Sequence, residues 1–169
     1  MATINVGFSK PKTWKPFAQL IMFGYSIPYD HVYIKFHSDY YNRDVIYQAS
    51  STMVNFMSPV IFQQNNVIVK EFPLDISDEN RKAMVGFAMD NAGKPYGAKQ
   101  CLGLAWVRIN KLFGKSINNP FSDNGTTYVC CEMAASIIEQ FDNIQVPYDL
   151  DTLDPKEFFD FMSQITRKV

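Results

Sequence analysis

Alternating hydrophobic and polar positions in the N-terminal part of the chain predict β-strands. In segment 31–36, HVYIKF, every second side chain is aliphatic or aromatic, which leaves His31, Tyr33 and Lys35 on the other face. The segment 44–49, DVIYQA, follows after a polar, turn-like stretch, so an antiparallel hairpin is expected. Further strands are expected at 2–8 and 66–72, where β-branched residues are enriched.

After residue 76 the hydrophobic spacing becomes helical. Ser77 can cap a helix that Gly93 ends, and Glu157 is spaced for a capping box with Asp154. The expected helices are 15–23, 78–92, 98–113, 130–141 and one that starts at Asp154-Pro155. Because most strands precede most helices, we expect an α+β fold with helices packed on an antiparallel sheet, in one domain over 1–169.

Composition and charge narrow the classes of partner. Hydrophobic residues make up 47% and charged residues 20%, which is typical of a globular protein. The net charge of -1 provides no strong field for nucleic acid. No apolar run approaches the ~18 residues that span a bilayer, and no signal peptide is recognisable. We therefore expect a cytoplasmic protein with no stable membrane insertion and no nucleic-acid partner.

The cysteines do not form a disulfide framework or a metal site. The chain has an odd number of cysteines, Cys101, Cys130 and Cys131. The last two are adjacent in sequence, and a disulfide between adjacent cysteines closes a strained ring. Neither CxxC nor HxxxH spacing occurs, so no metal and no cofactor is expected.

The segment 126–135, TTYVCCEMAA, predicts a reactive thiol. A strand-like run meets a cysteine at the start of an amphipathic helix, where free N–H groups and the helix dipole stabilise a thiolate. An α-helix turns by 100° per residue, so the side chains of Cys130, Ala134, Ile137 and Phe141 point in directions within about 60° of one another and share one helix face. Cys130 is therefore the expected nucleophile, and Cys131 is expected to pack at the side of the helix.

The thiol needs a base, and the chain has two histidines. His31 starts a strand that can hold it rigidly, whereas His37 lies in a polar stretch and is expected at the surface. A third group should orient the imidazole, and Gln48 on the neighbouring strand is the first candidate. Ser50 is a weaker one, and Asp30 is expected to point away from the His31 face.

Structural explanations exist for each of these residues. A buried cysteine at a helix start is often a small hydrophobic side chain, and a strand histidine is more often structural than catalytic. A non-catalytic module is therefore an open alternative to an enzyme.

The motifs HVYIKF, IYQAS, GKPYG and YVCCEMAA together resemble the permuted branch of the NlpC/P60 superfamily, the YiiX-like papain-fold hydrolases. That branch has an S-H-V strand, a polar residue on the next strand, a G-x-x-Y turn and a [FY]-x-C-S-E-L helix start. The resemblance covers about residues 25–140. Here Asp30 and Cys131 stand at serine positions and Met133 at the leucine position.

The resemblance implies a circularly permuted papain-like fold in which the histidine precedes the cysteine. It assigns Cys130 as nucleophile, His31 as base, Gln48 as orienter and Tyr96 to the cleft or the oxyanion. The implied activity is a thiol hydrolase that cleaves a peptide-like amide, such as a cell-wall peptide. A lipid or acyl-ester hydrolase or acyltransferase and a binding module on the same scaffold remain alternatives. A peptide-like or acylated substrate is the expected partner, and a phage protein acting in the host cell would suit such a sequence.

Overall fold

A five-stranded sheet forms the centre of the molecule, and every neighbouring pair of strands is antiparallel. The computed structural model describes residues 1–50, 52–123 and 125–167. The strand order is β4-β3-β2-β1-β5. The strands are β1 (Ala2–Pro11), β2 (His31–Ser38), β3 (Arg43–Ala49), β4 (Val54–Met57) and β5 (Asn66–Ile76).

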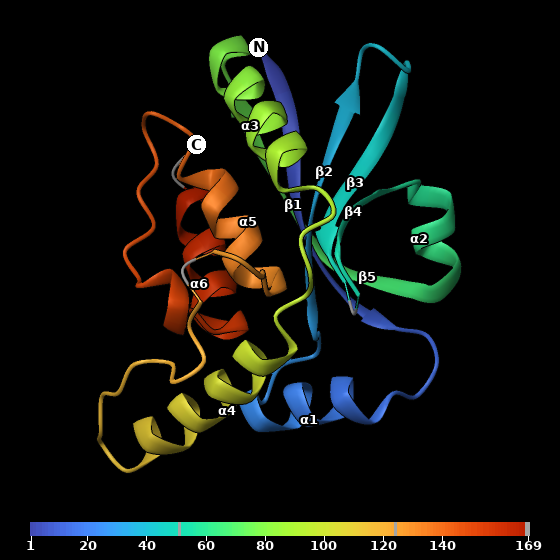
Figure 1. Cartoon of the computed structure of the whole chain (residues 1–169). Coiled ribbons are helices and arrows are strands. Elements are labelled where there is room, and N and C mark those ends of the chain that lie inside the picture. The colour runs from blue at the N-terminus through green and yellow to red at the C-terminus, as the bar shows by residue number, and fades with distance from the viewer. Residues whose placement is uncertain (51, 124, 168–169) are drawn as a thin grey trace.

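Helices cover both faces of this sheet. Figure 1 shows α5 and α6 on one side and α2 on the opposite side, with α1 and α4 side by side beyond one end of the strands. The helices are α1 (Pro16–Tyr25), α2 (Pro59–Asn65), α3 (Asp78–Asn91), α4 (Ala98–Leu112), α5 (Cys130–Ile138) and α6 (Pro155–Ile165). These elements confirm the α+β class.

Local sequence signals explain where several helices begin. The Ser77 side chain accepts a hydrogen bond from the Asn80 N–H at the start of α3. At α6, Asp154 Oδ1 accepts from the Glu157 N–H at 2.8 Å and Glu157 Oε2 accepts from the Asp154 N–H at 3.2 Å. The predicted cap and capping box are thus confirmed.

The expected strands and helices are all present, with shifted ends. The predicted 130–141 helix ends earlier, at Ile138, although Phe141 remains buried against the core. β4 and α2 were not predicted from the sequence. At four residues, β4 is too short to show a clear alternation, and α2 follows it directly.

Both faces of β2 are buried, each by a different layer. Val32, Ile34 and Phe36 face the main core, which α3, α5 and α6 complete. On the opposite face, Tyr33 packs against Phe62 of α2, with ring centroids 4.7 Å apart. A strand held on both sides gives its first residue, His31, a fixed position.

Candidate active site

Cys130 is the first residue of α5, and the helix start faces β2. Val129 is extended, and Glu132 Oε2 accepts a hydrogen bond from the Val129 N–H at 3.3 Å. This contact satisfies one of the free N–H groups at the helix start. The pairing of β2 with β3 ends at Ile34–Tyr47, and the backbone of Val32 lies close enough to the Cys130 sulfur to help lower the pKa of that thiol.

His31 lies between Cys130 and Gln48. The imidazole Nε2 is 2.7 Å from Gln48 Oε1, and the ring lies close enough to Cys130 for each group to shift the pKa of the other. Because Gln48 engages Nε2, Nδ1 is the nitrogen left for the thiol. The structure therefore brings together the three residues that the sequence predicted for the site, from α5, β2 and β3.

A further side chain fixes the direction of the Gln48 amide. Gln48 Nε2 donates to Asn55 Oδ1 at 3.3 Å, so its oxygen points toward His31. Asn55 Nδ2 in turn donates to Ser50 Oγ at 2.9 Å. Ser50, the weaker orienter candidate, thus lies at the far end of this hydrogen-bonded chain. Sequence reasoning missed Asn55, because its strand β4 was not predicted.

The electrostatics of the site favour a charged thiol. A hydrogen bond from Cys131 is the largest influence that lowers the pKa of Cys130 well below its usual range, and His31 adds a hydrogen bond and its charge against the opposing effect of burial. Burial also opposes charge on His31, but the contacts with Cys130 and Gln48 raise its pKa above the usual value. The two shifts together favour a thiolate–imidazolium pair.

Cys131 lies closer to the Cys130 sulfur than the helix geometry predicted. Its Sγ lies 4.0 Å from the Cys130 Sγ, and it is buried. The hydrogen bond to Cys130, followed by burial, raises the pKa of Cys131 well above its usual value. The two sulfurs are thus at the limit of a thiol hydrogen bond in which either could donate, and the opposite pKa shifts favour Cys131 as the donor.

Tyr96 lines the site from a short extended segment. The segment pairs with Tyr128 just before α5, because the Gly97 N–H donates to the Tyr128 carbonyl and the Tyr128 N–H donates to the Pro95 carbonyl. The Tyr96 hydroxyl lies 3.2 Å from Cys101 Sγ. Burial, followed by the Cys130 charge, raises the pKa of Tyr96 well above its usual value, so its hydroxyl is protonated.

Two cavities meet beside the Cys130–His31 pair. A cleft of about 360 Å³ with a mixed polar and apolar lining contains His31 and Gln48, and a strongly apolar pocket of about 380 Å³ contains Cys130. Phe17, Ile21, Asp30 and Tyr96 line both cavities. Asp30 precedes β2 outside the strand; burial raises its pKa to about 6, and its Oδ1 is buried with no hydrogen-bond partner among the described residues.

The other histidine is at the surface. His37 Nδ1 lies 3.0 Å from Asp44 Oδ1, and both side chains are about half exposed. It is separated from Cys130 by most of the length of β2, because His31 and His37 lie near opposite ends of that strand.

Comparison of the chain with protein-family models, with curated proteins and with solved structures found no match. In the part of the chain that the structure describes, no cluster of histidine, cysteine and carboxylate side chains is suited to hold a metal ion. Across the same residues, none of the helices has both the length and the hydrophobicity to cross a bilayer.

Proposed function

We propose that this chain is a thiol hydrolase that cleaves amide bonds, with Cys130 as nucleophile, His31 as general base and acid, and Gln48 as the group that orients the imidazole. The observation that supports this most strongly is the placement of Cys130 at the start of a buried helix beside His31, whose imidazole is hydrogen-bonded to Gln48.

The reaction follows from the positions of these groups. The Cys130 thiolate attacks the carbonyl carbon, and the N–H groups at the start of α5 stabilise the oxyanion. His31 donates its proton to the departing amine, the C–N bond breaks, and the acyl group remains on sulfur as a thioester. A water molecule, deprotonated by His31, then attacks the thioester and releases the acid and the thiol.

The permuted NlpC/P60 and papain-like resemblance belongs to the same proposal. The order of histidine before cysteine and the polar residue on the adjacent strand agree with it. Gln48 is neutral, so it selects the imidazole tautomer and does not add a charge that stabilises imidazolium. The hydrogen bond from Cys131 instead stabilises the thiolate half of the pair.

A para-nitrophenyl acetate assay tests this proposal. The ester is an activated substitute for the amide, so the wild-type chain should release para-nitrophenol and become acetylated on the peptide that contains Cys130, as read by mass spectrometry. Cys130→Ala and His31→Ala should lose the reaction. His37→Ala is the matched control, since that histidine is at the surface, and it should retain full activity.

Two results would contradict the proposal. The first is an absence of both turnover and the thioester in the wild-type chain, which would favour a binding module on this scaffold. The second is equal turnover in wild type and Cys130→Ala, which would show that another group reacts.

A further inference from the structure

We infer that the acyl part of the substrate is a long aliphatic chain that lies in the pocket between α1 and α4, while the leaving amine lies in the less apolar cleft beside His31. This inference rests on the proposed function and specifies its substrate class. It follows from the different lining of the two cavities that meet at the Cys130–His31 pair.

The pocket that contains Cys130 is lined almost entirely by apolar groups. Phe17, Leu20 and Ile21 contribute one wall from α1, and Leu102 and Leu104 contribute to the other wall from α4. With a volume of about 380 Å³ it lies within the range of small-molecule sites. Apolar surface of this kind favours a ligand without charge or hydrogen-bonding groups along its length.

The two charged side chains that line this pocket do not change its character. Arg108 lies with its guanidinium 5.3 Å from the centroid of the Tyr25 ring, and its charge also acts on Asp154. Asp30 lies at the junction with the cleft, since it lines both cavities, as Phe17 and Ile21 also do. The apolar length of the pocket therefore extends along α1 and α4, away from that junction.

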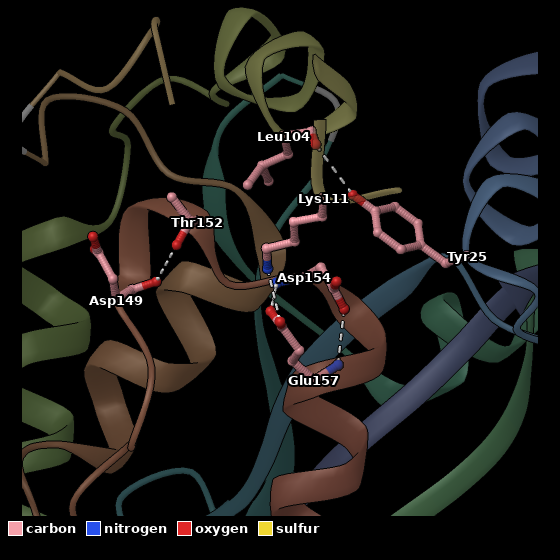
Figure 2. Close-up of polar contacts among 7 residues, drawn as sticks. All are labelled: Tyr25, Leu104, Lys111, Asp149, Thr152, Asp154 and Glu157. Carbon is pink, nitrogen blue, oxygen red and sulfur yellow. Dashed lines mark hydrogen bonds and ion pairs between the residues drawn. The ribbon is translucent and has the colours of Figure 1, made fainter. Parts of the chain in front are cut away.

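Specific contacts hold the walls of the pocket. Figure 2 shows the Tyr25 hydroxyl of α1 donating to the Leu104 carbonyl of α4, at 3.5 Å. It also shows Lys111 of α4 paired with Glu157 of α6, at 2.7 Å. Because α4 is tied to both neighbours, the pocket is a feature of the packed molecule and not of a loose helix.

The cleft on the other side of the pair has a mixed lining and is less apolar than the pocket. Lys15, Ser50, Asn65 and Asn66 line it together with His31, and apolar side chains such as Ala18 and Met57 complete it. In the reaction the acyl group stays on sulfur, and His31 protonates the group that leaves. Cys130 lines the apolar pocket and His31 lines the less apolar cleft, so the aliphatic chain corresponds to the acyl group and the group in the cleft to the amine.

Side chains at the edge of the pocket are unusually exposed for their size. Leu20 is 61% exposed and Leu102 is 59% exposed, although both line the pocket. An aliphatic chain lying between them would remove apolar surface from water. A protein partner would not explain why this surface leads inward to the nucleophile.

A series of para-nitrophenyl esters, from acetyl through butyryl and octanoyl to dodecanoyl, tests the inference. Each ester is used below the concentration at which it aggregates. Each added methylene that enters the pocket should raise kcat/KM by about fourfold until the pocket is filled. Ala105→Trp places a large ring on the wall, and Leu102→Asp places a charge on it. Both should lower the ratio of octanoyl to acetyl turnover, and an intact thermal transition shows that they fold.

Ala83→Trp is the matched control, because Ala83 is also an exposed helical alanine but lies on α3. It should keep the wild-type ratio. If the wild-type chain turns over the acetyl ester and its kcat/KM for the longer esters stays near the acetyl value, the chain-binding inference is wrong. The proposed hydrolase function would not be contradicted by that result. Loss of all acyl transfer, including acetyl, would instead count against the proposed function.

Discussion

At the scale of single residues, the site depends on which proton each group holds. The parity of two neighbouring strands was enough to predict that Gln48 could reach His31, and the 2.7 Å contact agrees with that geometry. The relation between Cys130 and Cys131 could not be predicted in the same way. A quarter-turn of helix separates their directions, and only the packed side-chain rotamers place the sulfurs 4.0 Å apart.

Changing Cys131 should therefore alter the acidity of its neighbour. Cys131→Ser keeps a hydrogen-bond donor and should leave activity and the apparent pKa of Cys130 near the wild-type values. Cys131→Ala removes the donor, and it should raise the apparent pKa of Cys130 by about one unit, because a hydrogen bond to a charged group is worth roughly 1.5–3 kcal/mol. Alkylation rate against pH measures the shift. Equal pKa values in the two variants would contradict the donor role.

Gln48 offers a second test at this scale. Gln48→Ala removes the group that orients His31, so kcat should fall more than KM rises. Gln48→Glu places a carboxylate beside the imidazole, stabilises the imidazolium, and should lower the apparent pKa of Cys130 by about one unit. If Gln48→Ala has full activity and Gln48→Glu an unchanged profile, Gln48 is not part of the site.

At the scale of the elements, the site depends on a strand that the sequence pattern did not reveal. The longer strands and helices were predictable because their periodicity extends over enough positions and caps mark several of their ends. β4 has only four residues, so its alternation carries little information. Yet β4 supplies Asn55, whose contact with Gln48 fixes the direction of the amide.

Asn55 should accordingly act on the reaction without touching the substrate. Asn55→Ala frees the Gln48 amide to rotate, and we expect kcat to fall about fivefold to tenfold, as for the loss of one hydrogen bond. Asn55→Asp keeps an acceptor for the Gln48 N–H and should retain most of the activity. A pH–rate profile separates this positioning effect from a general loss of folding. A positioning effect should shift the pH values at which the rate changes, whereas a loss of folded protein would lower the rate at every pH and leave those pH values unchanged. Matching kinetics for Asn55→Ala and wild type would remove Asn55 from the site.

At the scale of the whole molecule, the buried helix α5 brings a carboxyl into the core. Glu132 is 5% exposed, and burial is the main cause that raises its pKa from 4.5 to about 7. A carboxyl with a raised pKa in the folded state binds its proton more tightly there than in the unfolded chain. Its contribution to stability is thus fully present below pH 4.5 and is lost as the pH rises to about 7.

Glu132→Gln should make the thermal stability less dependent on pH across that window. The glutamine keeps an oxygen that can accept from the Val129 N–H, so the helix start is preserved. The wild-type chain should lose on the order of 3 kcal/mol of stability from this group between pH 4.5 and 7, and the variant should not. Melting curves at several pH values compare the two, and identical slopes would contradict the assignment.

The most direct test of the account is the pH dependence of Cys130 alkylation by iodoacetamide, followed by mass spectrometry of its peptide. The measurement uses a Cys131→Ser background, so that one thiol remains in that peptide, with and without His31→Ala. If Cys130 and His31 form a thiolate–imidazolium pair, the alkylation rate should reach its plateau at a pH well below the ordinary thiol pKa of about 8.5. The pH at which the plateau begins should rise when His31 is removed. A Cys130 that titrates at or above that ordinary value, unchanged by His31→Ala, would contradict the thiolate–imidazolium pair.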